Sequence, residues 1–320
     1  AYEIVDCDWS SDVCSSDLGT GAAATVTGVG FSPDLVLSEA RGSQNPKAAF
    51  FDRLRGATKY LVSAGTGGSV TSISAEQTDA TTLTAFGMDG YSLGAETANV
   101  VINGATTYIN WNFRRAPGFF DVVCYTGTGS ATTQAHNLGV APELMIVKRR
   151  NGAAEDWYVY HSAVGNGWFL NLDLTATPTS SGQAWNNTTP TSTVFTVGNL
   201  GGTNSSTNTF VNYIFATLAG ISKVGSYTGN GSSQTINCGF AAGARFILIK
   251  RTDSTGDWYV WDSARGIVSG DDPHLSLNTT AAEVTTDDSI DPDSTGFIVN
   301  QLAATNINVN TATYIYLAIA

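Results

Sequence analysis

Residues 125–130 read YTGTGS and return as YTGNGS at residues 227–232. Each is followed by a strand-like run, PELMIVKR at 142–149 and RFILIKR at 245–251, and PDLVL at 33–37 is an earlier counterpart. The two longer runs are apolar at odd and even positions alike, which is typical of central strands buried from both sides. The chain therefore repeats one β-rich unit.

Further motifs set the period of the repeat. A tryptophan-centred strand recurs as DWYVY at 156–160 and DWYVW at 257–261. Each copy closes on a strand led by a tyrosine, Tyr108, Tyr213 or Tyr314, with spacings of 105 and 101 residues. Because solenoid repeats are about 20–50 residues long, this longer period predicts a whole small domain per copy.

The closing strand predicts which face of each unit is buried, since residues two apart share a face. One face is apolar in all three copies, and we expect it to point into the core: Ile109, Trp111 and Phe113; Ile214, Ala216 and Leu218; Ile315, Leu317 and Ile319. The opposite face varies, so we expect it to be exposed or packed on a neighbouring unit.

The fold class follows from short β-branched runs separated by Gly, Asn, Asp and Thr turns, without a sustained helical period. We expect an all-β chain of three tandem antiparallel β-sandwich domains of the jelly-roll or lectin-like kind. Their predicted bounds are 19–118, 119–222 and 223–320, with almost no linker between them.

Residues 1–18 need a separate interpretation. The run DWSSDVCSSDL at 8–18 resembles an in-frame translation of a short-read library adapter, and AYEI at 1–4 resembles its far end. The resemblance implies a processing artefact from a metagenomic assembly, which fold reasoning must set aside. We then expect the native chain to start near Gly19, with its first strand truncated.

Composition limits the class of function. The net charge is −12, and five acidic residues lie in 1–18, which leaves −7 for the rest. This acidity argues against a nucleic-acid partner, which needs a basic face. Apolar runs are too short for a membrane-spanning helix, so we expect no membrane insertion. Cys124 and Cys238 occupy non-equivalent places in the repeat and indicate neither a disulfide framework nor a zinc site.

The YTGxG opening, the PxLxxVK-like strand and the aromatic-DxxRG turn at 51–56 and 261–266 resemble a domain that recurs in bacteriophage virion proteins. The similarity covers nearly all of 19–320. It implies a non-enzymatic structural or host-attachment role in a tail fibre, with other virion proteins and a host-surface glycan as partners. It also implies a homo-oligomer, with a trimer as the expected form, in the virion.

Two other function classes stay open. One is a secreted bacterial lectin-like or adhesin protein on the same sandwich. The other is a polysaccharide-degrading enzyme, although the sequence offers no paired carboxylates or nucleophile constellation that we would assign as catalytic.

Aromatic residues are the candidate ligand-binding residues, because flat rings stack on sugar faces. They are Trp157, Tyr158, Trp168, Trp185, Trp258 and Trp261. Trp157 and Trp258 recur at one place, as core anchors also do. Trp168 and Trp185 occur in copy two alone, so we expect them to be better exposed.

Charged clusters give weaker signals. Asp287, Asp288, Asp291 and Asp293 lie near a glycine and are candidate ligands of a calcium loop, because calcium prefers clustered oxygen ligands; solvated loop carboxylates are the alternative interpretation. The pairs Asp52–Arg55 and Asp262–Arg265 are interpreted as turn-stabilising ion pairs, worth at most about 1 kcal/mol if exposed. Copy two has His161 and Val164 in their place. The three histidines, His136, His161 and His274, do not recur at matched positions and are interpreted as turn or surface residues.

Overall fold

The computed structural model describes residues 17–42, 48–64, 71–97 and 101–320, and of residues 17 and 18 only the backbone. The described chain is all-β, as expected, with antiparallel pairing in every ladder. Its two helices, α1 (Gly182–Trp185) and α2 (Gly201–Asn204), are one turn each. The strands fall into three segments, which we call repeats 1, 2 and 3.

The described residues of repeat 1 form nine strands. Six form a large sheet in the order β1-β9-β3-β4-β5-β6, and three form a small sheet in the order β2-β8-β7. The strands are β1 (Asp17–Leu18), β2 (Ala24–Thr27), β3 (Leu35–Ala40), β4 (Ala49–Asp52), β5 (Lys59–Val62), β6 (Gln77–Thr78), β7 (Leu83–Phe86), β8 (Gly90–Leu93) and β9 (Thr107–Phe113).

Repeat 2 has a large sheet in the order β10-β17-β12-β13-β14-β15 and a small sheet of β11 and β16. The strands are β10 (Phe120–Thr126), β11 (Thr132–Ala135), β12 (Leu144–Arg149), β13 (Trp157–His161), β14 (Trp168–Asn171), β15 (Thr179–Ser180), β16 (Val194–Val197) and β17 (Thr209–Phe215).

Repeat 3 has a large sheet in the order β18-β25-β20-β21-β22 and a small sheet in the order β19-β24-β23. The strands are β18 (Ser222–Thr228), β19 (Gln234–Asn237), β20 (Phe246–Arg251), β21 (Trp258–Asp262), β22 (His274–Ser276), β23 (Ile290–Asp293), β24 (Gly296–Val299) and β25 (Thr313–Ile319).

The three large sheets follow one plan. In each large sheet, the last strand of the repeat lies between the first strand and a third strand, β3, β12 or β20. This third strand carries the apolar run that recurs in every repeat. The ladder registers agree residue by residue, because Leu35, Leu144 and Phe246 pair with Phe113, Phe215 and Ile319 respectively. Positions in the three repeats can therefore be matched directly.

Both faces of each large sheet are buried, as the apolar runs predicted. All six residues of β12 are buried. Leu144 and Ile146 point to one side, whereas Met145 and Val147 point to the other and pack with the small sheet of their own repeat. The same division holds for β20.

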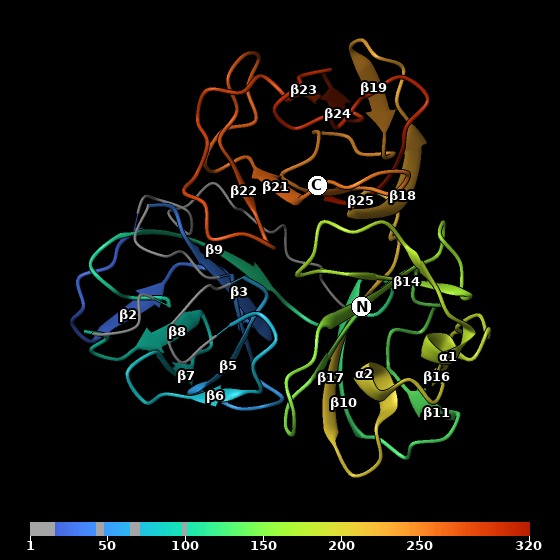
Figure 1. The fold of residues 1–320 in the computed structure, drawn as a ribbon. Coiled ribbons are helices and arrows are strands. Elements are labelled where there is room, and N and C mark those ends of the chain that lie inside the picture. The colour runs from blue at the N-terminus through green and yellow to red at the C-terminus, as the bar shows by residue number, and fades with distance from the viewer. Residues whose placement is uncertain (1–16, 43–47, 65–70, 98–100) are drawn as a thin grey trace.

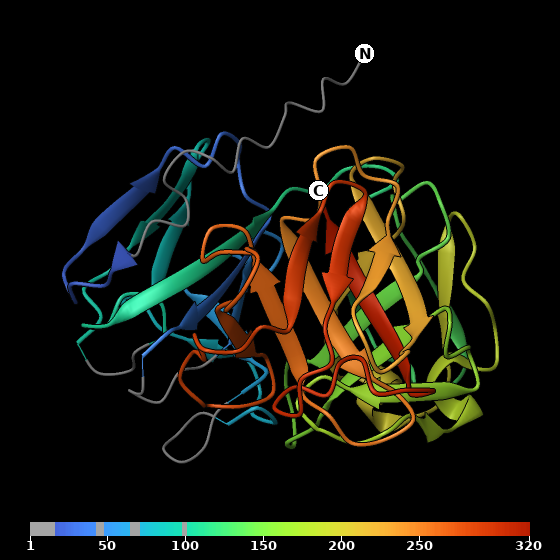
Figure 2. The same ribbon diagram turned by 90° about the horizontal axis from the view of Figure 1, so that it is seen from above.

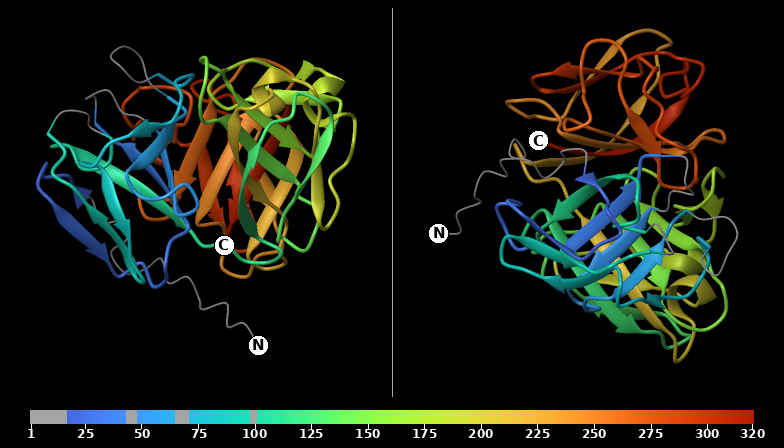
Figure 3. Two further views of the ribbon diagram at one scale, coloured as in Figure 1. Left: turned by 90° about the horizontal axis from the view of Figure 1, so that it is seen from below. Right: turned by 90° about the vertical axis from the view of Figure 1, so that its left-hand side faces the viewer.

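The outer faces belong to separate small cores, but the inner faces of all three large sheets form one shared core. Figure 1 shows the three repeats as three lobes, and Figures 2 and 3 show the large sheets facing one another from above, from below and from the side. At the meeting point the Phe113 ring lies 5.8 Å from the rings of both Phe215 and Phe246. Members from every repeat contribute to the shared core, including Leu37, Trp111, Ile146, Tyr213, Leu248 and Leu317.

One prediction about the closing strands is wrong in repeat 2. The equivalent of Tyr108 and Tyr314 is Phe210, not Tyr213, because β9, β17 and β25 begin at Thr107, Thr209 and Thr313. An odd offset exchanges the two faces of a strand. Ile214 and Ala216 therefore pack in the small core of repeat 2, and Leu218 lies beyond the strand in a bridge to Ser222.

The predicted role of the variable face also needs correction. Tyr108 and Tyr314 are buried within their own repeats, so this face is neither exposed nor packed on a neighbouring repeat. The apolar face of the closing strands is the one that meets the neighbours in repeats 1 and 3.

Most of the segment attributed to adapter, residues 1–16, lies outside the described residues. Its last two residues form β1, which pairs with β9 at Tyr108 and Thr107. β10 and β18 make the equivalent pairing in the other repeats. β1 thus occupies part of the first-strand position, and the adapter interpretation stays a prediction.

Candidate functional site

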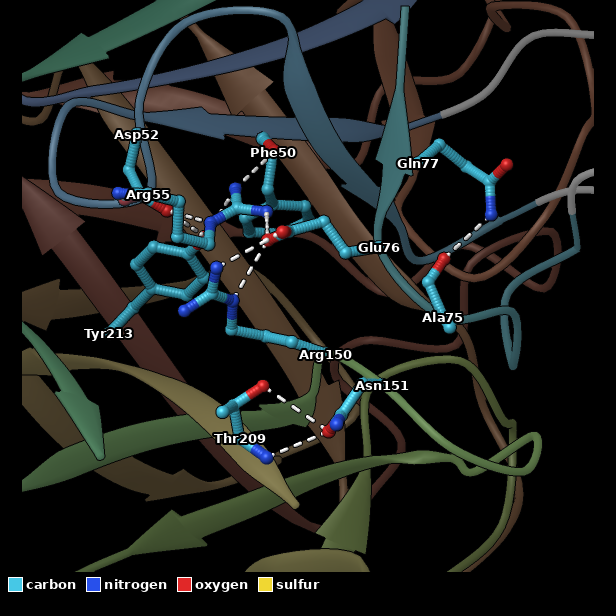
Figure 4. Close-up of polar contacts among 10 residues, drawn as sticks. All are labelled: Phe50, Asp52, Arg55, Ala75, Glu76, Gln77, Arg150, Asn151, Thr209 and Tyr213. Atoms are coloured by element: carbon cyan, nitrogen blue, oxygen red, sulfur yellow. Dashed lines mark hydrogen bonds and ion pairs between the residues drawn. The ribbon is translucent and has the colours of Figure 1, made fainter. Parts of the chain in front are cut away.

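A buried ionic network joins repeats 1 and 2 (Figure 4). The Arg55 guanidinium is fully buried and bonds to the carboxylate of Asp52, to Glu76 at 3.1 Å and to the Tyr213 hydroxyl at 3.1 Å. That hydroxyl donates to Asp52 at 2.8 Å, and Arg150 binds Glu76 at 2.9 Å. Burial alone would lower the pKa of Arg55, but Asp52, Tyr213 and Glu76 outweigh it and the pKa is raised.

The same network joins repeats 3 and 1. Arg265 binds Asp262 at 2.6 Å and Glu283 at 3.1 Å, and Glu283 also binds Arg41 at 2.9 Å. Trp111 takes the place of Tyr213, and its indole nitrogen donates to Asp262 at 3.0 Å. The two networks agree down to the backbone, since the amides of Glu76 and Glu283 donate to the carbonyls of Arg150 and Arg41.

The sequence predicts these pairs to be turn-stabilising ion pairs, weak if they are exposed. Both do begin at a turn, because the amides of Arg55 and Arg265 donate to Asp52 and Asp262. However, the side chains are buried and tie two repeats together, so the weak contribution of an exposed pair does not apply. The sequence did not reveal the other members of each network, because they come from distant strands.

The third interface, between repeats 2 and 3, lacks the network. Leu144 is the equivalent of Leu35, and Leu144 pairs with His161 whereas Leu35 pairs with Asp52, so His161 occupies the position of Asp52. The β5–β6 and β14–β15 ladders have the same register, which places Pro178 at the position of Glu76. The positions of the five network residues Asp52, Arg55, Glu76, Arg150 and Tyr213 are taken here by His161, Val164, Pro178, Thr252 and Leu317. Every ionic group of the network is thus replaced by a residue that is uncharged at neutral pH.

His161 is the replacement for the buried aspartate. It is almost fully buried at the end of β13, and its Nδ1 accepts from the Ala163 amide at 3.2 Å. Burial lowers the pKa of His161 to about 4, so the imidazole is neutral at pH 7. The third interface therefore holds no charge where the other two hold several.

An open pocket of about 780 Å³ lies at this interface. Three of the five replacing residues line it: Val164, Pro178 and Thr252. Trp168 lines it from β14, and Ser226 and Thr228 line it from β18. The pocket therefore overlaps the place where the network is missing, at the positions of Arg55, Glu76 and Arg150.

Trp168 is the one predicted ligand-binding aromatic that the structure leaves accessible. It is 44% exposed, and it shares a face of β14 with Leu170, which belongs to the shared core. The lining beside it from repeat 2 is mostly apolar, whereas strand β18 contributes Ser226 and Thr228, both exposed. Among the hydrogen bonds of the described residues, neither of these hydroxyl groups has a partner.

The other five predicted aromatics are buried and play structural parts. Trp157 and Trp258 donate across interfaces, to the carbonyls of Val62 and Asn171 at 2.8 Å each. Trp261 and Tyr158 pack in the small cores. The expected exposure of Trp185 is wrong, because it is completely buried and donates to the Trp168 carbonyl.

A family model matches nearly the whole chain. The family model described as "Domain of unknown function (DUF7483)" matches residues 10–320. The chain belongs to this family. No curated protein and no solved structure matches it.

Two lysines strengthen the interfaces of this family member. Lys148 and Lys250 are matched positions on β12 and β20, and each donates to a carbonyl of the preceding repeat, Ser72 at 3.1 Å and Thr175 at 2.8 Å. Burial lowers the pKa of each lysine to about 8. At the matched position Glu39 is also buried, and burial raises its pKa.

The four predicted calcium ligands do not come together as a metal cluster. Asn300 bonds to both Asp288 and Asp291, Asp287 lies 4.0 Å from His274, and Asp293 accepts from its own turn at Thr295. Within the described residues, no group of three or more His, Cys, Asp or Glu side chains is placed to hold a metal ion. The calcium hypothesis stays a prediction.

The remaining candidates have local roles. His136 bonds to the Thr191 carbonyl, and Cys124 and Cys238 are unpaired thiols whose pKa burial raises to about 11. In the part of the chain that is described, no helix is long and apolar enough to cross a membrane.

Proposed function

We propose that this chain is a non-enzymatic attachment module of a phage virion appendage, and that it binds a host-surface glycan in the pocket between repeats 2 and 3. The observation that carries the proposal is an open pocket lined by the exposed Trp168 and by the exposed hydroxyl-bearing residues Ser226 and Thr228. In this proposal the three β-sandwich repeats span 19–118, 119–222 and 223–320 and share their inner core.

The chemistry of the pocket favours a sugar. A pyranose ring has an apolar face that stacks on an indole, and its hydroxyl groups exchange hydrogen bonds with serine and threonine. Ligand sites in general combine apolar walls with a few polar groups, and typical pockets are about 300–1,000 Å³. This pocket falls within that range.

A binding role is favoured over hydrolysis by the carboxylates. Glycosidases place two carboxyl groups about the scissile bond. Among the described residues lining the pocket the acidic one is Asp253, and Arg251 binds it through two contacts at 2.9 and 3.0 Å. A paired, ionised carboxylate is a poor general acid.

The experiment is a glycan-array screen of the full chain beside two variants. Trp168→Ala should lose at least tenfold in affinity, whereas Met88→Ala, an 84% exposed apolar residue in repeat 1, should bind as the parent does. Equal binding by all three proteins would refute the site. Absence of binding to any bacterial surface polysaccharide would refute the function.

A secreted bacterial lectin or adhesin is the second candidate, since the same pocket would serve it. The DNA upstream of Gly19 in the source genome separates the two. A trimeric fibre shaft encoded there supports the virion, and a secretory signal peptide supports the lectin.

A further inference from the structure

The pocket stands where an ionic network stands at the other two interfaces. At those interfaces an arginine, a glutamate and an aromatic ring fill the space, as Arg55, Glu76 and Tyr213 do between repeats 1 and 2. Between repeats 2 and 3 the matched residues are the smaller Val164, Pro178 and Leu317. Two of these smaller residues, Val164 and Pro178, line the pocket.

The replacements also remove every charged side chain of the network together. Leaving one arginine or carboxylate buried without its partner is strongly unfavourable, so the network can be removed only as a set. The set is removed here, down to Thr252 at the position of Arg150 and His161 at the position of Asp52.

The charge that remains at the rim is internally balanced. Asp253 and Arg251 bind each other through both carboxylate oxygens. An anionic ligand would be repelled by Asp253 and would find no unpaired cation among the described residues lining the pocket. A cationic ligand would have to compete with Arg251 for the Asp253 carboxylate. An uncharged ligand meets neither penalty.

We infer that the pocket is a specialised repeat interface whose ligand is an uncharged saccharide segment, stacked on Trp168 and hydrogen-bonded by Ser226 and Thr228. This inference rests on the proposed function and narrows its ligand from glycans in general to neutral ones. It also assigns the binding site to one interface of three, so that one chain carries one site. The two interfaces that keep their networks hold the ring of repeats together.

The test uses two sets of probes with the full chain: neutral oligosaccharides, and acidic ones that carry uronic or sialic acid on the same backbone. Calorimetry or glycan-array binding should show affinity for at least one neutral probe and at least tenfold weaker affinity for its acidic counterpart. Preference for the acidic probe would overturn the neutral ligand and leave the attachment function standing. Failure of both sets would overturn both.

The location is tested by filling the pocket. Thr228→Tyr places a ring in the pocket from an exposed position on the edge strand β18, where tyrosine suits a strand, so the fold should survive. Affinity for the neutral probe should fall at least tenfold. The double variant His161→Asp, Val164→Arg, which rebuilds the pair seen at Asp52 and Arg55, should have the same effect if it folds. Unchanged binding by folded Thr228→Tyr would overturn the location.

Thr133→Tyr is the matched control. It is also an exposed threonine on a strand of repeat 2, β11 in the small sheet, and it does not line the pocket. It should bind the neutral probe as the parent does. A loss equal to that of Thr228→Tyr would mean that the added ring acts through stability and would overturn the argument for the site.

Discussion

Replacing Arg55 with methionine tests whether the buried networks hold the repeats together. The side chain is completely buried and bonds to Asp52, Glu76, Tyr213 and the Phe50 carbonyl. Methionine keeps the unbranched shape and much of the volume but removes every one of these contacts. The buried Asp52 carboxylate then keeps only neutral donors, the backbone amide of residue 55 and the Tyr213 hydroxyl.

The expected magnitude follows from the partner that is left behind. Removing one member of a buried ion pair costs about 3–5 kcal/mol, because the remaining charge is neither solvated nor paired. Arg150 still binds Glu76, so the penalty centres on Asp52. Such a loss is a large share of the roughly 5–15 kcal/mol that separates folded from unfolded domains.

Val164→Ala is the matched control, since Val164 occupies the position of Arg55 in repeat 2. It lines an open pocket, so the change removes little packing and should cost about 1 kcal/mol or less. Urea unfolding followed by tryptophan fluorescence measures both variants against the parent. A loss for Arg55→Met no greater than that for Val164→Ala would refute the role assigned to the network.

Three further predictions concern titration, metal and assembly. Because burial lowers the pKa of His161 to about 4, below its value of about 6.5 in the unfolded chain, the unfolded state binds the extra proton first as pH falls. The stability that His161 contributes should be complete above pH 6.5 and decline between about 6.5 and 4, and His161→Leu should flatten this part of the stability curve; an unchanged curve would contradict the assignment. If Asp287, Asp288, Asp291 and Asp293 bind calcium, adding calcium should raise the melting temperature of the protein. An unchanged melting temperature would refute the calcium-loop hypothesis. The homo-trimer expected from the family resemblance should appear in light scattering of the full chain, whereas a monodisperse monomer would contradict it.

The fold class and the repeat were predictable because they depend on local patterns. Apolar residues at every position of 144–147 and 246–249 marked strands buried on both sides, and the structure confirms this. The closing strand of repeat 2 was misaligned by three residues because Tyr213 resembles Tyr108 by type. Only the ladder shows that Phe210 holds the equivalent place.

The site was predictable in part. Trp168 was identified as an accessible aromatic, and the departure of His161 and Val164 from the Asp–Arg pattern was visible in the sequence. The pocket itself was not, because it depends on Pro178 and Thr252, which come together only when repeats 2 and 3 pack. The exposure predicted for Trp185 was wrong, since nothing in its local sequence reveals that its ring packs against Tyr160 and donates to the Trp168 carbonyl at the start of β14.

The shared core also could not be predicted from separate units. Each repeat has an apolar inner face that a two-layer sandwich would expose, and the sequence does not say what covers it. The three inner faces bury one another because the three repeats are arranged as a ring around the shared core. Within this arrangement two of the three interfaces, between repeats 1 and 2 and between repeats 3 and 1, also carry buried ionic networks.

A crystal structure of the full chain with a bound neutral oligosaccharide tests the account most directly. We predict a sugar ring stacked on Trp168, with hydroxyl groups within hydrogen-bond distance of Ser226 and Thr228, at the interface of repeats 2 and 3 and at neither of the other two. A saccharide bound elsewhere on the chain, with this pocket holding only water, would contradict it.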